Sequence, residues 1–560
     1  MAQIIECVPN FSEGRDLSVI RQITDRIEAV EGVELLDVDP GQATHRTVVT
    51  FAGAPEAVVE AAVEAARTGA ELIDMTRHQG EHPRFGALDV CPLVPVAGIS
   101  MDETVEYARE LARRLGEEVG LTVYCYENAA ASEERRNLAA VRTGEYEGLK
   151  DRLSQPEWQP DFGPAVFNPH SGATAVGARD FLVAYNINLN TTSTRRANAV
   201  AFDVREKGRI KRQGHPLTGE IVRDDNGDPV YTPGSLEAVK AIGWYIEEYG
   251  IAQISMNLTN IAATPVHVAF DEVCRRAEDR GLRVTGSELV GLVPLAAMLE
   301  AGRYFLRQQQ RSLGLPDREI IKIAVKSLGL DDLQPFDPDK KIIEYVLAGK
   351  SQDLLVDRPL VDFVDETASE SPAPGGGSVS AAVGALGAAL GTMVANLSAH
   401  KRGWDERWEE FSDQAVRGRS SVEELITLVD EDTRAFNGIM AAFRLPQGTE
   451  AERAERDSVI QEATKRAMEV PLEIAEKALA SMEMIKAMAA SGNPASVSDA
   501  GVGALCARAA VRGAALNVRI NSSGLKDKPA VEEYLQRAEE AVSRAEALES
   551  EILEIVAETL

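Results

Sequence analysis

Val33-Glu34-Leu35-Leu36-Asp37-Val38 and Arg46-Thr47-Val48-Val49-Thr50-Phe51 are the stretches from which the fold of the first part of the chain can be inferred. Their alternation of apolar and polar residues predicts two paired strands. Helical patterns flank the pair, and short apolar strands precede and follow them. The expected order is a strand at Ile4–Val8, a helix at Leu17–Val30, the strand pair, a helix at Ala57–Arg67 and a strand near Leu88–Val96. This order is β-α-β-β-α-β, the split βαβ arrangement.

A second pass of the same pattern follows. It consists of a strand at Phe181–Ile187, a helix at about Thr194–Glu206, two strands flanking Gly250 (the second at Ala252–Leu258), a helix at Val266–Arg276 and a strand near Leu289–Pro294. A charged connector is expected over roughly Arg318–Arg358.

From about Leu360 onward strand signals vanish and Ala-, Glu- and Arg-rich helical stretches fill the chain, punctuated by Pro446, Pro471 and Pro494. We therefore predict an α+β fold, with two ferredoxin-like βαββαβ subdomains, followed by an all-α helical bundle domain. The expected boundaries are 1–180, 181–347, a linker at 348–357, and 358–560. An α+β part joined to an all-α part indicates either two active sites or an enzyme with an oligomerisation module.

Composition limits the possible partners. The 560 residues carry a net charge of −30, which argues against nucleic acid and against anionic membranes. The five cysteines lie far apart with no C-x-x-C pair, as expected for free thiols in a reducing compartment. The N-terminus lacks the pattern of a signal peptide, so we expect a cytoplasmic protein.

Residues 378–398 carry no charge and could be mistaken for a membrane span. Ala, Gly and Ser dominate this stretch, and it has no aromatic belt. Small residues let helices approach closely, and Gly387-x-x-x-Gly391 is of this kind. We expect a buried helix of the bundle.

The segment Arg77-His78-Gln79-Gly80-Glu81-His82-Pro83-Arg84-Phe85-Gly86 concentrates two of the seven histidines with a carboxylate and two arginines. Its glycines and proline predict a rigid loop, the kind of element that carries catalytic groups. An imidazole titrates near neutrality, so His82 is a candidate general acid/base.

Two alternatives remain open for this loop. His78, Glu81 and His82 fit the H-x-x-E-H pattern of inverted zinc peptidases, which requires a helix that Gly80 and Pro83 oppose. The histidines could also simply form local hydrogen bonds on a surface loop.

The helical part has its own candidates. Pro374-Gly375-Gly376-Gly377-Ser378 opens the small-residue helix, where exposed backbone N–H groups could hold an anion, unless the segment is only a hinge. On the helix over Val422–Met440, Asp432 falls at the edge of the apolar stripe while Asp430 points away. Burial would raise the pKa of Asp432 toward that of a general acid, although an arginine could equally pair with it. Asn517 and Asn521, one turn apart, are ligand contacts or interhelical hydrogen bonds.

Several long motifs resemble a known family. Glu6-Cys7-Val8-Pro9-Asn10-Phe11-Ser12-Glu13-Gly14, the loop from Arg77 to Asp89, and Gly172-Ala173-Thr174-Ala175 with Gly177-Ala178-Arg179 are similar to glutamate formimidoyltransferase. The glycine-rich segment and Asp430-x-Asp432 resemble formimidoyltetrahydrofolate cyclodeaminase. Their order is that of the bifunctional formimidoyltransferase-cyclodeaminase family, and together they cover nearly the whole chain.

The resemblance implies a role for particular positions. His82 matches the acid/base of the transferase and Asp432 that of the cyclodeaminase. The implied substrate-binding residues are Gly163, Pro164, Ala165, Val166, Phe167, Asn168, Pro169, His170, Ser171 and Gly172, then Gly234, Ser235, Leu236, Glu237, Ala238, Val239, Lys240, Ala241, Ile242 and Gly243, and in the helical domain Gly375, Gly376, Gly377 and Ser378. Family members assemble as homo-oligomers, a dimer or a ring of dimers.

The implied chemistry uses tetrahydrofolate as co-substrate and N-formimidoyl-L-glutamate as donor, with no metal or redox cofactor. Arg46 and Arg84 are candidate carboxylate clamps by chemistry alone. Residues 214–233 are an insertion relative to the animal pattern, with Asp225-Asn226-Gly227 as a tight turn. Ser235-Leu236-Glu237-Ala238 is less basic than a site for a polyglutamate tail would need to be. A zinc hydrolase, or a transferase with a non-catalytic helical oligomerisation domain, remains the alternative.

Overall fold

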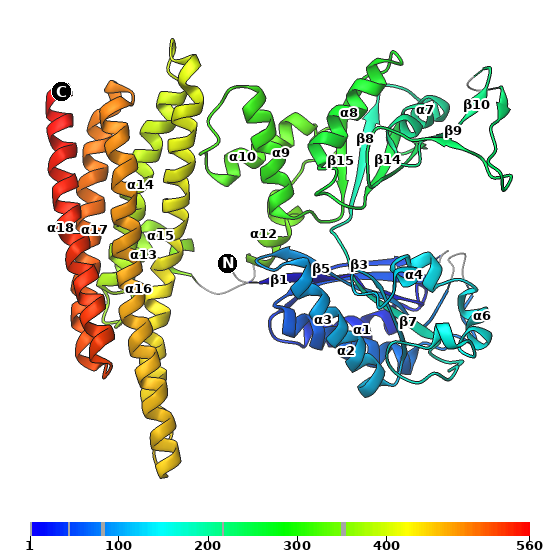
Figure 1. Cartoon of the computed structure of the whole chain (residues 1–560), viewed down its shortest axis with the longest axis horizontal. Coiled ribbons are helices and arrows are strands. Elements are labelled where there is room, and N and C mark those ends of the chain that lie inside the picture. The colour runs from blue at the N-terminus through cyan, green and yellow to red at the C-terminus, as the bar shows by residue number, and fades with distance from the viewer. Residues whose placement is uncertain (1–2, 43–44, 80–83, 216–217, 349–353) are drawn as a thin grey trace. The chain divides into compact units, whose positions relative to one another are not determined.

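A computed structural model describes residues 3–42, 45–79, 84–215, 218–348 and 354–560. Contacts divide the chain into two compact units, one formed by Met1–Met298 with Leu328–Lys350 and the other by Leu299–Ser327 with Ser351–Leu560. The first unit combines strands and helices, and the second is helical (Figure 1). The predicted α+β fold followed by a helical bundle is confirmed.

The first sheet contains the strand pair from which the fold was inferred. Strand β3 (Val33–Gly41) lies antiparallel to β4 (Arg46–Gly53), with Leu35 opposite Phe51. From one edge of the sheet to the other the order is β3, β4, β1 with β2, β5, β7 and β6. The short strands β1 and β2 each pair with β4 on one side and with β5 on the other. The remaining bounds are β1 (Ile4–Cys7), β2 (Asn10–Phe11), β5 (Leu88–Ala97), β6 (Thr122–Glu127) and β7 (Ala173–Ala178). The parallel strands β7 and β6 extend the sheet beyond the expected βαββαβ pattern.

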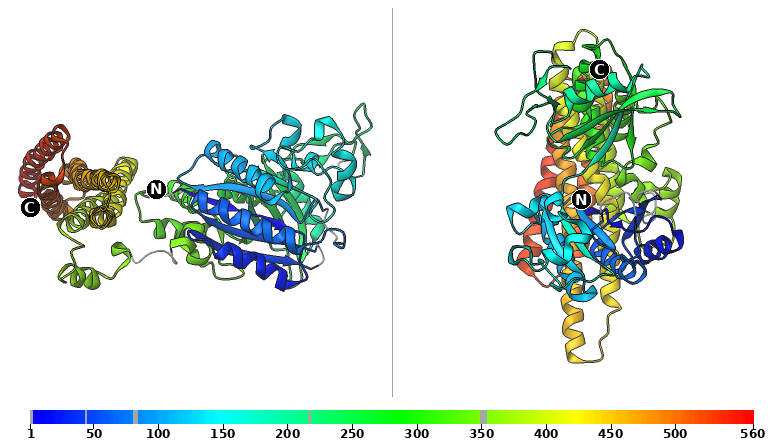
Figure 2. Two further views of the ribbon diagram at one scale, coloured as in Figure 1. Left: turned by 90° about the horizontal axis from the view of Figure 1, so that it is seen from below. Right: turned by 90° about the vertical axis from the view of Figure 1, so that its right-hand side faces the viewer.

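Three helices cover one face of this sheet and bury its apolar residues (Figure 2). They are α1 (Leu17–Glu28), α2 (Pro55–Leu72) and α3 (Met101–Arg114). Helix α3 was not predicted, although its start carries a recognisable signal. The Ser100 side chain accepts from the Glu103 backbone while the Glu103 carboxylate accepts from Ser100, a capping box.

The second sheet is antiparallel throughout, in the order β13-β14-β8-β15. Its strands are β8 (Val183–Leu189), β13 (Val239–Ile246), β14 (Ile251–Leu258) and β15 (Val284–Val290). Helices α7 (Thr194–Val204) and α8 (Val266–Glu278) pack against it and against each other. The second βαββαβ pass is therefore present where the sequence predicts it.

The segment predicted to be an insertion, 214–233, contributes two short strands that pair with two strands just before it. Strand β9 (Arg209–Ile210) pairs with β12 (Tyr231–Thr232), and β10 (Arg212–Gln213) pairs with β11 (Glu220–Ile221). The expected tight turn is present, with Gly227 at a φ of 85°. The Asp224 side chain accepts hydrogen bonds from the backbone of Asn226 and Asp228.

Between the second sheet and the bundle the chain is mostly helical rather than an extended connector. The helices here are α9 (Leu295–Gln308), α10 (Asp317–Leu328), α11 (Pro338–Lys341) and α12 (Ile343–Ala348). Helix α10 contains both apolar and charged residues, and its apolar residues Ile320, Ile321 and Ala324 are buried. The stretch predicted as a charged connector thus contains the polar face of this helix.

The helical unit is built around one helix of small residues. Helix α14 (Gly376–Ala399) contacts α15 (Trp408–Phe443), α16 (Glu450–Ser491) and α17 (Val497–Asn521), while α18 (Lys528–Thr559) packs on α16 and α17. By length and hydropathy α14 could cross a membrane, but 61% of its most apolar window is buried inside the unit. Its glycines allow close approach, since a Cβ on Gly387 would lie 2.8 Å from the carbonyl oxygen of Gly503. The expected buried helix is confirmed.

Pro471 does not separate helices as predicted but lies inside α16. A proline removes the hydrogen bond to the carbonyl four residues earlier, here that of Ala467. The Asn521 side chain of α17 donates to this carbonyl oxygen at 2.7 Å. The neighbouring helix thus satisfies the group that Pro471 leaves free, and α16 continues.

Candidate active sites

His82 and its neighbours Gly80, Glu81 and Pro83 lie outside the described residues. The described residues before and after them define the surroundings of this loop. Arg84 follows it directly and is engaged within the chain. Its guanidinium donates to Glu147 at 2.5 Å, to the Met75 carbonyl at 3.1 Å and to the His78 carbonyl, and it lies 4.7 Å from the centre of the Tyr146 ring. These contacts hold the Arg84 side chain against Met75, His78, Tyr146 and Glu147.

His78, at the start of the loop, stacks on His45, a contact that the sequence did not reveal. The rings of His45 and His78 stack at 4.4 Å, and Nε2 of His45 lies 3.0 Å from the Glu13 carboxylate. Nε2 of His78 lies 2.7 Å from the His45 carbonyl, so this nitrogen carries the proton and donates. Burial lowers the pKa of His78, which is therefore neutral at physiological pH.

The zinc hypothesis needs Glu81 and His82 beside His78. Within the described ranges no group of three or more His, Cys, Asp or Glu side chains is arranged to hold a metal ion. The alternative of local hydrogen bonding is realised for His78 in its contact with His45.

A cationic cluster lies on the first sheet around the buried Asp89. Arg46 donates to Asp89 at 3.0 Å and through Nε and Nη2 to the Asn10 amide oxygen, while Arg142 also donates to Asp89. Asp89 is 1% exposed, and burial lowers the pKa of both arginines to about 10, so they remain charged at neutral pH. The cluster therefore brings two guanidinium groups to one place on the sheet, and guanidinium groups are the kind that bind an anionic substrate. Arg142 was missed because its place in the chain carries no motif.

Glu6, on β1, is a buried carboxylate of this unit. It is 5% exposed, and burial raises its pKa to about 7, against the opposing charge of Arg179. A carboxyl group that titrates near neutrality can accept or release a proton at physiological pH. Glu6 belongs to the motif that opens the chain, but a sequence alone does not reveal burial.

The first predicted folate stretch, Gly163–Gly172, is bound to both ends of the His82 loop. Met75 donates to the His170 carbonyl at 3.0 Å, Ala87 donates to Ser171 at 2.8 Å, and Gly86 and Gly172 form a β-bridge. A Cβ on Gly86 would lie 2.1 Å from the Ala173 carbonyl oxygen, so only glycine allows this approach. The structure therefore brings together two segments that the sequence separates by about eighty residues.

The second predicted stretch, Gly234–Gly243, enters β13 and alternates between two environments. Val239 and Ala241 are buried beneath α7, and Gly243 exchanges two hydrogen bonds with the Asn198 side chain. Lys240 and Ile242 are exposed on the opposite face. Because side chains alternate along a strand, this second face is the part of the stretch that a ligand could touch.

In the helical unit, three predicted elements converge at the start of α14. The Asp432 carboxylate accepts hydrogen bonds from the Ser378 backbone at 2.8 Å and from its hydroxyl at 2.9 Å. A Cβ on Gly377 would lie 2.0 Å from Oδ1 of Asp432, and one on Gly376 would lie 3.1 Å from the Asn517 amide. Burial raises the pKa of Asp432, while the Ser378 hydrogen bonds oppose that shift. Gly377 is therefore required for this packing, and the segment is the packed start of α14, not a hinge.

Asp430 differs from its prediction. It is 8% exposed and its carboxylate accepts a hydrogen bond from the Leu355 backbone at 2.8 Å. Helical phase placed it away from the stripe of α15, but the short turn at Leu355–Asp357 covers that face of the helix. Asn521 is bound to α16 through Ala467, which leaves Asn517 as the asparagine at the glycine-rich start.

Family models and individual relatives match the whole length of the chain. The matched models are the formiminotransferase domain, N-terminal subdomain, over residues 4–179, the formiminotransferase domain over 184–348, and formiminotransferase-cyclodeaminase over 359–540. Formimidoyltransferase-cyclodeaminase of Gallus gallus is 46% identical and that of Sus scrofa 43%, each over 99% of both chains. Glutamate formimidoyltransferase of Thermoplasma acidophilum is 40% identical over 54% of this chain and 92% of its own.

Proposed function

Because the chain belongs to the formimidoyltransferase-cyclodeaminase family, we propose how its residues divide two consecutive reactions between two sites. The enzyme transfers the formimidoyl group of N-formimidoyl-L-glutamate to tetrahydrofolate, its co-substrate. It then cyclises the product to 5,10-methenyltetrahydrofolate and releases ammonia. The observation that carries the proposal is the convergence of Asp432, Ser378 and the glycine-rich start of α14 in the half that matches the cyclodeaminase model.

The proposed domains are a transferase in two subdomains, 1–180 and 181–347, a linker at 348–357 and a cyclodeaminase domain at 358–560. Each of the two sheets falls within one proposed subdomain. Residues 299–327, although within the second subdomain, pack with the helical unit.

In the transferase reaction, N5 of tetrahydrofolate attacks the formimidoyl carbon and forms a tetrahedral intermediate. His82 takes the proton from N5 and returns it to the glutamate nitrogen, which leaves as its bond to carbon breaks. We assign Arg46 and Arg142, the two guanidinium groups beside Asp89, to a carboxylate of the donor substrate. Arg84, the other candidate clamp, is held by Glu147, Met75 and His78.

Folate is assigned to Gly163–Gly172 and to the uncovered face of Gly234–Gly243. The first stretch is favoured by its hydrogen bonds to both ends of the His82 loop. In the second stretch we assign contact to Lys240 and Ile242, and a supporting role to Val239, Ala241 and Gly243.

In the second reaction, N10 of the folate attacks the same carbon of the protonated formimidoyl group, and the C=NH2+ nitrogen becomes an amine. Asp432 takes the proton from N10 and delivers it to this amine, so that ammonia leaves. Ser378 positions Oδ2 of Asp432, and the backbone at Gly375–Ser378 holds the substrate against it. A carboxyl group whose pKa is raised by burial can give back the proton that it takes.

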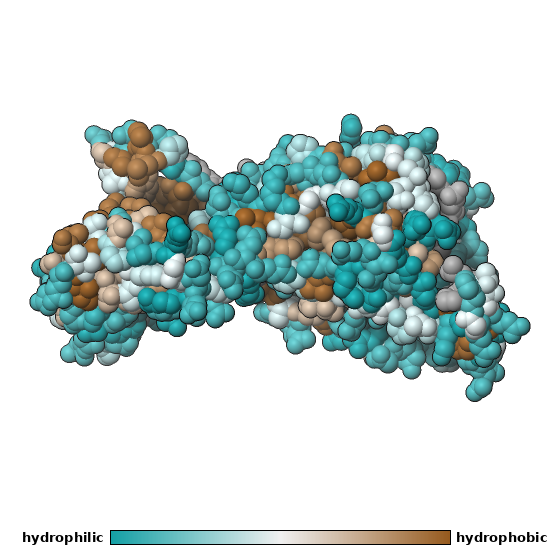
Figure 3. Space-filling model, turned by 90° about the horizontal axis from the view of Figure 1, so that it is seen from above, coloured by the Kyte–Doolittle hydropathy of each residue, from teal (hydrophilic) through white to brown (hydrophobic). Residues whose placement is uncertain are grey.

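We also propose that the chain forms a homo-oligomer through its helical unit. Apolar side chains are exposed in a stripe on α17 (Val502, Leu505, Leu516 and Ile520). Apolar patches are visible on the helical part at the left of Figure 3. Contiguous exposed apolar surface of this kind is typical of a protein interface. All five cysteines are free, which supports a reducing, cytoplasmic location.

The decisive experiment is a coupled assay with tetrahydrofolate and N-formimidoyl-L-glutamate that follows glutamate, ammonia and the near-ultraviolet absorbance of 5,10-methenyltetrahydrofolate. The unaltered chain forms all three, and His82→Ala forms none of them. Supplied with 5-formimidoyltetrahydrofolate, His82→Ala still releases ammonia. Loss of ammonia release from that substrate in a folded His82→Ala enzyme would contradict the assignment of two separate sites.

A further inference from the structure

Two neighbouring cavities of about 380 and 370 Å³ lie within the helical unit. Arg419 of α15 lines both of them. The walls of the first are mainly apolar and include Met393 and Leu397 of α14. Polar groups dominate the second, which is lined by Arg303 and Arg307 of α9.

The segment between α9 and α10 forms a fixed wall of these cavities. Ser312 donates to the Asn396 side chain at 2.6 Å, and Asn396 donates to the Gly314 carbonyl at 3.1 Å. Gly314 lies directly on α15, since a Cβ there would be 2.3 Å from the Ala415 carbonyl carbon. The cavities are therefore preformed, as ligand sites usually are.

The charge of the lining is unusual for a chain with a net charge of −30. Arg303, Arg307 and Arg311 recur every four residues, and across the described ranges none of the three forms a salt bridge or a hydrogen bond through its side chain. Arg419 pairs with Glu423 at 2.8 Å. Four arginines and one carboxylate among the lining residues leave three positive charges in excess.

His400, at the edge of the apolar cavity, responds to this charge. Burial and the positive charge of Arg311 lower its pKa, so it is neutral at physiological pH and can donate or accept a hydrogen bond. Asn396 and Thr392 add polar groups to the same cavity.

The cavities are separate from the Asp432 site. Thr392 is 14 residues beyond Ser378 on α14, which is about 21 Å along a helix at 1.5 Å per residue. Arg419 precedes Asp432 by 13 residues on α15, about 20 Å. A ligand here would contact neither the glycine-rich start of α14 nor Asp432.

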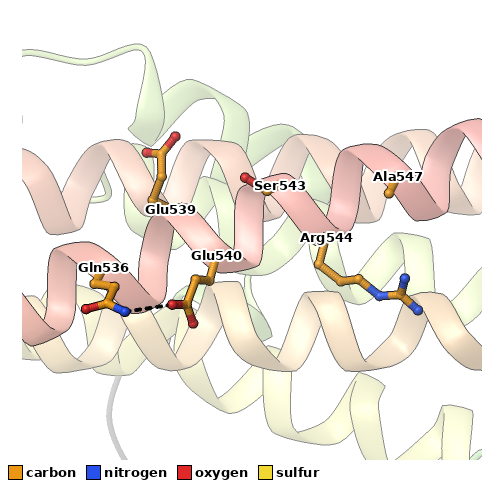
Figure 4. Close-up of a pocket in the computed structure, with 6 residues that line it drawn as sticks. All are labelled: Gln536, Glu539, Glu540, Ser543, Arg544 and Ala547. Carbon is orange, nitrogen blue, oxygen red and sulfur yellow. Dashed lines mark hydrogen bonds between the residues drawn. The ribbon is translucent and has the colours of Figure 1, made fainter.

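Another groove of the helical unit, of about 650 Å³, offers a contrast. It runs along α18, where Gln536 donates to Glu540 at 2.8 Å and Glu539 and Arg544 flank it (Figure 4). Arg544 is paired with Glu483. Glu539 is likewise paired with Arg519, whereas Arg303, Arg307 and Arg311 have no such partner among the described residues.

We propose that the paired cavities bind a small organic anion with at least two neighbouring carboxylate or phosphate groups beside an apolar part. Guanidinium groups bind both kinds of anion through paired hydrogen bonds. Arginines four residues apart on a helix are about 6 Å apart along its axis, a spacing that suits more than one anionic group. The apolar cavity next to them accommodates the rest of the ligand.

The test is isothermal titration calorimetry of the full chain with inorganic triphosphate and with citrate. The unaltered chain is expected to bind at least one of them saturably, and Arg303→Gln/Arg307→Gln to bind it roughly tenfold more weakly or worse. Tighter binding of triphosphate identifies a phosphate site, and tighter binding of citrate identifies a carboxylate site.

The matched control is Arg537→Gln/Arg544→Gln, which removes two charges from α18 and is expected to bind as the unaltered chain does. Absence of saturable binding of both probes would overturn the proposal. So would equal affinity of the Arg303→Gln/Arg307→Gln chain and the unaltered chain. Binding is measured without turnover, so neither result depends on the assignment of the two reactions.

Discussion

Asp432 and Asp430 are two residues apart on α15. Asp430 is buried and Asp432 is half-buried, and the two carboxylates have different hydrogen-bond partners. Asp430 accepts a hydrogen bond from the Leu355 backbone and holds a turn in place. Asp432 faces the start of α14, where Ser378 donates twice to one of its oxygens. The pair therefore offers a matched comparison between a proposed catalytic carboxylate and a structural one.

We predict that Asp432→Asn lowers the rate of ammonia release about 10²- to 10⁴-fold, because a proton carrier is lost, and leaves the transferase rate unchanged. Asp430→Asn should retain both activities and lower the free energy of unfolding by about 1 kcal/mol. Single-turnover assays with 5-formimidoyltetrahydrofolate, and chemical denaturation, measure the two effects. Equal rates for the two variants would exclude Asp432 as the acid/base.

Gly377 and Gly376 provide a second comparison at the same site. Gly377→Ala places a methyl group 2.0 Å from Oδ1 of Asp432 and must displace that carboxylate, so cyclodeaminase activity should fall at least about tenfold. Gly376→Ala meets the Asn517 amide at 3.1 Å, where a side chain can move slightly, and should cost less activity. Initial rates of ammonia release from the two variants decide the order.

The raised pKa of Glu6 predicts that the free energy of unfolding depends on pH. Its pKa in the folded chain is about 7 against a reference of 4.5, so its contribution is fully present below pH 4.5 and is lost as the pH rises toward 7. The difference of about 2.5 units corresponds to about 3 kcal/mol. Glu6→Gln, which cannot ionise, should therefore gain stability relative to the unaltered chain between pH 5 and 8. Thermal unfolding of both chains across this range measures the gain, and a constant difference would contradict the buried, protonated state.

At the scale of elements, most helices and strands of the βαββαβ passes follow from periodicity. Strands β3 and β4 were predicted by their alternation, and α1 and α2 by their apolar faces. Strands β6 and β7 were not, because they are almost entirely buried and carry little alternation. Pro471 was misjudged for another reason: a side chain on a different helix satisfies the carbonyl that it leaves free.

This last contact predicts a coupling between α16 and α17. Asn521→Ala should lower the free energy of unfolding by about 1 kcal/mol or more, because the buried Ala467 carbonyl loses its donor. In a Pro471→Ala background the helix can supply its own N–H, so the same change should cost less. A double-mutant cycle by chemical denaturation measures this difference. Additive effects of the two changes would show that Asn521 does not compensate for Pro471.

At the scale of the whole molecule, the proposed oligomer depends on the exposed stripe of α17. Leu516→Glu/Ile520→Glu places two charges in the α17 stripe, where the side chains are 61% and 71% exposed, and should reduce the assembly to smaller species. Light scattering coupled to size-exclusion chromatography measures the mass. Leu17→Glu, at a 59% exposed position of α1, is the control and should leave the mass unchanged. An unaltered mass in the double variant would place the interface elsewhere.

The sequence by itself determined the α+β part, the helical part, their order and the identity of the proposed acid/base residues. These follow from periodicity and from local motifs, which are properties of neighbouring residues. Only the tertiary structure decided which groups meet. It placed Arg142 beside Arg46 and Asp89, Gly163–Gly172 against the His82 loop, and Ser378 against Asp432. Burial, pKa shifts and charge compensation depend on residues that are distant in the chain, and so no local pattern can contain them.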